Sequence, residues 1–172
     1  MSQDSVPTRA RIGLILPSSN RLGEPHISGH APSGVAVHAT RLRMTGPYRM
    51  PLEELQPLIA EAAGMLADAG CDPIVFHCTA NSMAEGVEAE HRIGQTIETT
   101  TGGGSSTTAS ATVAALRALN AKHIVLISPY ERETHQHEID FLTESGIEIV
   151  AERNLGLAGS NAYSSAPTNL WR

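Results

Sequence analysis

The chain has 172 residues, of which 41% are hydrophobic and 17% are charged, with a formal net charge of −6. The acidic balance and the lack of a basic cluster exclude a nucleic-acid partner, and no apolar stretch is long enough for a membrane span or a signal peptide. Two cysteines do not make a disulfide framework, so we expect a reduced, cytoplasmic protein of one domain or two small lobes.

Apolar runs closed by turn residues alternate along the chain with segments whose apolar residues recur at helical spacing. The predicted elements, in chain order, are strands over 11–16 and 34–42, a helix over 52–69, a strand over 74–76, helices over 82–95 and 106–119, a strand over 123–128, a helix over 131–145 and a strand over 147–151. The second helix is expected to break near Gly86, and a Thr- and Gly-rich loop over 99–106 to follow a short strand. This alternation predicts an α/β fold with doubly wound parallel sheets.

Two segments share one pattern. Pro17 closes an apolar strand and Gly34 begins the next strand, 17 positions later by direct count; Pro129 and Gly146 repeat this spacing. Generic α/β sequences also place glycine before strands, but a fixed period favours duplication. We therefore predict two pseudo-symmetric lobes, the first over 1–118 and the second over 119–172.

The repeat also predicts a counterpart of Cys78. Counted from Gly146, that counterpart falls near position ~190, beyond Arg172. We therefore expect the second lobe to be incomplete, without its third strand. An incomplete lobe exposes an apolar face and a strand edge, which favours either a fragment of a longer protein or self-association into a homo-oligomer.

Cys78 is the residue best placed for chemistry. It follows the strand over 74–76, and open α/β sheets bind ligands at the carboxyl ends of their strands. A thiol at a helix N-terminus is expected to ionise more easily. The alternative is a buried and inert cysteine, because free cysteine is among the most buried residue types. The position alone leaves these two interpretations evenly balanced.

Hydroxyl and amide side chains gather at the other predicted strand ends. Such groups, with the free N–H groups of helix starts, bind carboxylates without supplying a formal charge. Taken singly, each is more simply an N-cap or a turn residue. The set comprises Ser18, Ser19, Asn20, Thr79, Asn81, Ser82, Ser105, Ser106, Thr107, Thr108, Tyr130 and Asn161.

Other motifs do not predict a cofactor or a metal. The glycine run at 102–104 is not followed by the Gly-Lys pair of a phosphate loop. His135 and His137 lie two apart on a predicted helix and therefore face different sides. His77 is expected to point to the opposite side of its strand from Cys78, and Cys71 at a helix end is interpreted as structural.

The segments 12–20 and 77–82 resemble the opening and the first cysteine loop of maleate cis-trans isomerases. The segments 107–119, 127–130 and 155–157 resemble later parts of the same enzymes. Arylmalonate decarboxylases share much of this pattern, and both groups belong to the Asp/Glu racemase superfamily. The resemblance runs from Arg11 to about Tyr163 and implies two pseudo-symmetric, flavodoxin-like lobes with the ligand between them.

The resemblance also implies a cofactor-independent isomerase that uses no metal. In such an enzyme Cys78 attacks the alkene carbon of a small dicarboxylate such as maleate. The resulting succinyl thioether rotates about the former double bond and releases fumarate. By the same resemblance the two carboxylates are held by Ser19, Asn20, Thr79, Ala80, Tyr130 and Asn161.

The chain departs from the superfamily pattern because it has no second-lobe cysteine. Racemases use two thiols on opposite faces of the substrate, which Cys78 alone cannot supply. Arylmalonate decarboxylases keep the second-lobe cysteine and typically carry glycine at the position of Cys78. Isomerisation by thiol addition is therefore the leading hypothesis. The alternatives are an inactive or carboxylate-binding relative, and a fragment of a racemase-type or decarboxylase-type enzyme.

Overall fold

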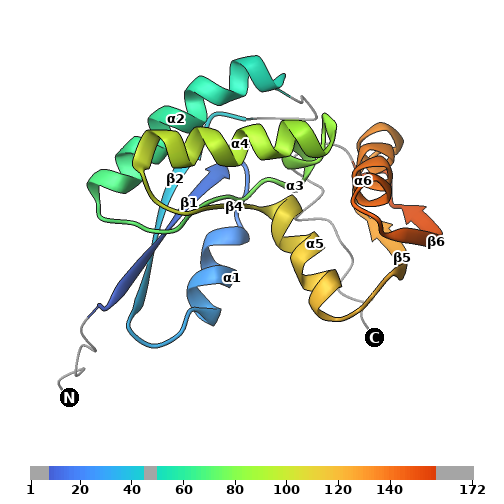
Figure 1. Cartoon of the computed structure of the whole chain (residues 1–172), viewed down its shortest axis with the longest axis horizontal. Coiled ribbons are helices and arrows are strands. Elements are labelled where there is room, and N and C mark those ends of the chain that lie inside the picture. Colours follow the sequence, from blue (N-terminus) through green and yellow to red (C-terminus); the bar gives the residue numbers. More distant parts are fainter. Residues whose placement is uncertain (1–7, 45–49, 158–172) are drawn as a thin grey trace.

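The computed structural model describes residues 8–44 and 50–157 (Figure 1). In this part strands alternate with helices, as predicted. The elements are β1 (Ala10–Pro17), α1 (Gly23–His30), β2 (Val35–Leu42), α2 (Leu52–Asp68), β3 (Ile74–Phe76), α3 (Thr79–Ser82), α4 (Gly86–Thr101), β4 (Ser105–Thr107), α5 (Thr108–Ala118), β5 (His123–Ser128), α6 (Arg132–Glu144) and β6 (Glu148–Asn154). Among the helices of these ranges, none combines the length and the apolar character needed to cross a bilayer.

The strands form two parallel sheets, which confirms the predicted fold class. The larger sheet has the order β2-β1-β3-β4, and the smaller pairs β5 with β6. Figure 1 shows α2 and α4 on one side of the larger sheet and α1 on the other. Because helices cover both faces of β1, Leu14, Ile15 and Leu16 are completely buried, as expected for a central parallel strand.

The main core lies between the larger sheet and α2 with α4. The buried residues of α2 include Leu55, Ile59, Ala62 and Leu66, a spacing that places them on one helix face. A second cluster joins α3, α5 and α6. In it Met83, which directly follows α3, packs with residues of the second half that include Phe141 and Leu142 of α6. The two halves of the chain therefore meet where α6 packs against α4 and the end of α3.

The smaller sheet is covered by α6 on one face only within the described residues. On its other face Val125, Ile127 and Val150 are 62%, 64% and 58% exposed. The apolar surface expected for the second half is therefore present. The pairing of β5 with β6 also shifts by one residue between Ile124 and Val125, so that Ser128 lies opposite Asn154.

The observed boundaries correct two details of the prediction. The break near Gly86 is confirmed, but α4 continues to Thr101 and ends at Gly102, whose φ of 69° suits a left-handed helix cap. The short strand expected before the glycine run instead follows it, as β4. There Ser105–Thr107 pairs with β3, and this tertiary pairing outweighs the weak strand preference of serine.

Candidate active site

Two of the predicted site segments meet at one sheet edge. β1 and β3 are adjacent and parallel, so the loops that follow them leave the same edge of the sheet. The backbone N–H of His77 donates to the carbonyl of Ile15 at 2.9 Å, which extends the pairing towards Cys78. The structure thus brings the Asn20 loop and the Cys78 loop side by side.

Cys78 is the N-cap residue of α3 and is 5% exposed. Its thiol lies in the core cluster formed beneath α2 and α4. The Asn81 amide Nδ2 donates to Cys78 Sγ at 3.4 Å, while Asn81 Oδ1 accepts the backbone N–H of Met50 at 3.2 Å. Asn81 therefore both orients the thiol and ties it to the start of α2. The sequence places Asn81 among the strand-end polar groups but not among the implied substrate ligands.

The expected easy ionisation of Cys78 is wrong in this structure. Burial raises the pKa of the Cys78 thiol, and hydrogen bonds from the side chain and backbone of Asn81 oppose this effect only in part. The α3 helix spans only Thr79–Ser82, so its dipole is small and the loss of hydration dominates. Burial therefore favours the neutral thiol form of Cys78.

His77 points away from Cys78, as predicted. Its Nδ1 lies 3.5 Å from Thr108 Oγ1, and its ring packs so closely on α1 that a Cβ added to Gly23 would approach His77 Cδ2 to 2.7 Å. Burial lowers the pKa of the His77 imidazole, which favours its neutral form. His77 is therefore not positioned as a base for the thiol.

The Asn20 loop is held by short polar contacts. Asn20 is 5% exposed, and its Oδ1 accepts the backbone N–H groups of Leu22 at 3.0 Å and Gly23 at 2.8 Å. The hydroxyl of Ser19 donates to the carbonyl of Met44 at 3.2 Å. Within the described residues no acceptor contacts Asn20 Nδ2. This amide is the group of the loop that can donate to a bound carboxylate.

Of the remaining predicted ligands, those within the described residues lie at two places. Thr79 and Ala80 form the half-buried first turn of α3, where backbone N–H groups lack intrahelical acceptors. Tyr130 follows β5 in the smaller sheet, on the half of the chain that reaches α3 through α6. Asn161 lies outside the described residues.

A polar cluster around the buried His135 in the second half was not predicted. His135 Nδ1 lies 2.8 Å from Ser128 Oγ, and His135 Nε2 lies 2.6 Å from Glu152 Oε2. Glu138 Oε2 is 3.6 Å from His135 Nδ1 and has no hydrogen-bond partner among the described residues. Burial raises the pKa of Glu138, opposed by Ser128 and His135. The three-residue spacing of His135 and Glu138 on a helix was the available signal.

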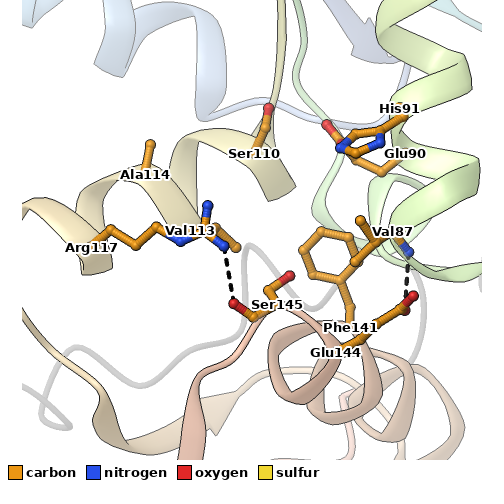
Figure 2. A pocket seen from close by; sticks show the side chains of 10 residues that line it. All are labelled: Val87, Glu90, His91, Ser110, Val113, Ala114, Arg117, Phe141, Glu144 and Ser145. Atoms are coloured by element: carbon orange, nitrogen blue, oxygen red, sulfur yellow. Dashed lines mark hydrogen bonds and ion pairs between the residues drawn. The ribbon is translucent and has the colours of Figure 1, made fainter.

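A separate cavity of about 300 Å³ lies between α4, α5 and α6, and Figure 2 shows the side chains that line it. Val113 and Phe141 are among its buried apolar lining residues. At its rim the Arg117 guanidinium donates to the Ser145 carbonyl at 3.1 Å, and the Val87 N–H donates to Glu144 at 3.2 Å. Its lining includes none of the predicted site residues. It marks the junction of the two halves rather than the strand-end loops.

The sequence matches the family model described as arylmalonate decarboxylase over residues 12–169. A maleate isomerase from Geobacillus stearothermophilus is 30% identical over 152 residues, an alignment that covers 81% of this chain. The chain spans 61% of the length of that relative.

Solved structures of maleate isomerases are also similar to this chain. A mutant of the Nocardia farcinica maleate cis-trans isomerase with a covalently bound succinylcysteine intermediate has a TM-score of 0.76 and 29% identity, covering 86% of this chain and 64% of that one. A variant of the maleate isomerase of Pseudomonas putida S16, solved with maleate, has a TM-score of 0.78 and 26% identity, covering 94% and 70% of the two chains.

Proposed function

The chain belongs to the arylmalonate decarboxylase family, and from this premise we propose that it isomerises a small cis-dicarboxylate of the maleate type through Cys78. The observation that carries the proposal is the position of Cys78 Sγ. It lies at the end of β3, contacted by the Asn81 amide at 3.4 Å, beside the loop that carries Asn20. The relatives with 26–30% identity support this reaction because they are maleate isomerases, one of which contains a succinylcysteine intermediate.

The proposed chemistry is addition of the thiol across the double bond, followed by its reversal. Sulfur bonds to one alkene carbon and the thiol proton ends on the other, which gives a succinyl thioether. The former double bond is now single and rotates. Elimination then returns the proton and the electron pair to sulfur and releases the trans isomer. All atoms and electrons balance within substrate and thiol, so the proposal requires no cofactor.

The surrounding residues have distinct roles in this proposal. Asn20 Nδ2 and the free N–H groups of Thr79 and Ala80 bind one carboxylate, and Tyr130 binds the other from the second half. Asn81 stabilises charge that develops on sulfur, since its amide already donates to Sγ. Neutral donors suffice because the dicarboxylate brings both negative charges, although each donor then contributes less than an arginine would.

Proton NMR of maleate mixed with the protein tests the proposal. We expect fumarate to appear, and Cys78→Ala to lower the rate by at least about a thousandfold, because the covalent route is lost. Cys71→Ala is the matched control, since Cys71 is also a buried free thiol but lies in the core away from the loops. Absence of conversion by the wild type, or an unchanged rate in Cys78→Ala, contradicts the proposal.

Burial of the thiol and its raised pKa favour a second candidate, namely dicarboxylate binding without turnover. In that case maleate raises the melting temperature of the wild type and of Cys78→Ala equally, and no fumarate forms. Turnover by the wild type excludes this candidate.

A further inference from the structure

Arg41, near the end of β2, makes an unusual set of contacts with the loop after β1. Its Nη1 donates to the carbonyl of Asn20 at 2.6 Å and lies 3.5 Å from the carbonyl of Pro17. Its Nη2 forms an ion pair with Glu24 Oε2 of α1 at 2.8 Å. One planar guanidinium thus joins the end of β1, the loop and the following helix, which the fork geometry of arginine allows.

The sheet register explains why Arg41 reaches this loop. Arg41 lies opposite Leu16, one residue before the end of β1, so its side chain extends past the strand end. The carbonyl and the side-chain Oδ1 of Asn20 are then both occupied, by Arg41 and by the first N–H groups of α1. The orientation of the free Nδ2 follows from these two anchors.

The second half has a weaker version of the same arrangement. In the repeat, Arg153 is the counterpart of Arg41, because both follow the matched prolines by the same count of residues. The register shift in β5 and β6 instead places Asn154 opposite the last residue of β5. Asn154 Nδ2 donates to the carbonyl of Tyr130 at 3.4 Å, and the Gly156 N–H donates to the same carbonyl at 3.1 Å.

We propose that Arg41 is a positioning residue that fixes the Asn20 loop for carboxylate binding, and that Asn154 is its weaker counterpart for Tyr130. Arg41 acts through the loop and not on the substrate, because Glu24 neutralises its charge and both recorded Nη1 contacts are to backbone carbonyls. This inference rests on the proposed function for its effect on turnover. Its effect on the loop itself is independent of that function.

The test compares Arg41→Met and Arg41→Lys with the matched control Arg43→Met. Arg43 is an exposed arginine two positions further on, and no hydrogen bond of its side chain is recorded within the described residues. For Arg41→Met we expect the KM for maleate to rise about tenfold to a hundredfold with kcat changed less than about threefold, since binding rather than chemistry is affected. Arg41→Lys restores part of the loss, because lysine replaces the charge but not the fork.

Amide hydrogen exchange of residues 18–23 provides the readout that does not depend on activity. We expect faster exchange in Arg41→Met than in Arg43→Met, while the melting temperature of Arg41→Met stays within a few degrees of the wild-type value. Asn154→Ala gives a smaller rise in KM, about twofold to fivefold, because the Gly156 N–H still holds the Tyr130 carbonyl.

Three outcomes overturn the inference. The first is an Arg41→Met variant with wild-type KM and wild-type exchange, in which case turnover by the wild type leaves the proposed function intact. The second is an Arg41→Met variant in which kcat and the melting temperature fall as strongly as KM rises, which marks a merely structural residue. The third is equal loop exchange in Arg41→Met and Arg43→Met, which overturns the positioning role whether or not the wild type converts maleate. If the wild type does not convert maleate, the proposed function fails separately.

Discussion

The two strand–loop–helix–strand units, residues 10–42 and 123–154, share an order of elements but differ in their surroundings. β1 lies between β2 and β3 and has helices on both sides, whereas β5 has one described strand neighbour and one covered face. At matched positions of the repeat, Ile15 is completely buried and Ile127 is 64% exposed. The comparison shows that the repeated pattern determines the local structure, while neighbouring elements determine what each strand buries.

The units also differ in how they hold the loop at the strand end. In the first, a guanidinium and an asparagine cap fix the Asn20 loop. In the second, Asn154 and backbone N–H groups fix the Tyr130 loop, while the polar cluster around His135 joins α6 to the sheet. Positions that the sequence repeat matches therefore carry different side-chain chemistry.

The largest expected effect separates the matched isoleucines. Ile15→Ala removes a completely buried side chain and should lower the free energy of unfolding by about 2–5 kcal/mol. Ile127→Ala, at an exposed position, should change it by less than about 0.5 kcal/mol. Urea denaturation of both variants measures the difference. A cost above about 2 kcal/mol for Ile127→Ala would show that the outer face of the smaller sheet is covered in solution.

A second, smaller effect compares the starts of α5 and α6. Thr107 caps α5 through Ser110 and donates to the buried Glu90 carboxylate at 2.5 Å, whereas Glu131 makes no side-chain cap at α6. Thr107→Val should lower the free energy of unfolding by about 2–3 kcal/mol, because it removes the helix cap and leaves the buried Glu90 carboxylate without its hydrogen-bond donor. Thr107→Ser and Glu131→Ala should cost far less in the same denaturation experiment. Equal costs for Thr107→Val and Thr107→Ser would show that the hydroxyl contributes nothing.

The smallest effect concerns pH. Glu138 is buried in α6, whereas its repeat counterpart His26 is exposed in α1. Burial raises the pKa of Glu138 above its ordinary value of 4.5. The protonated carboxyl therefore adds to the free energy of unfolding below pH 4.5, and this contribution is lost as the pH rises through the raised pKa. The melting temperature of the wild type should therefore fall more steeply above pH 4.5 than that of Glu138→Gln. Parallel melting curves against pH would contradict this assignment.

The sequence predicted the features that depend on local pattern. The strand before Cys78, the break at Gly86 and the orientation of His77 follow from apolar runs, glycine and strand alternation, and the structure confirms them. It did not predict features that depend on tertiary surroundings. The pKa of Cys78 is set by burial beneath α2 and α4, and the role of Asn154 depends on a one-residue register shift that no local motif marks. Arg41 was missed because its contacts with the loop are to backbone carbonyls, and its side-chain partner Glu24 lies on another element.

Covalent trapping at Cys78 tests the central claim most directly. The protein is mixed with maleate, quenched in acid, digested and analysed by peptide mass spectrometry. The proposal predicts a succinyl adduct on the peptide that contains Cys78, formed at a rate that keeps pace with fumarate production, and no adduct in Cys78→Ala. Fumarate production without any adduct on Cys78, or an adduct that forms only on Cys71, would contradict it.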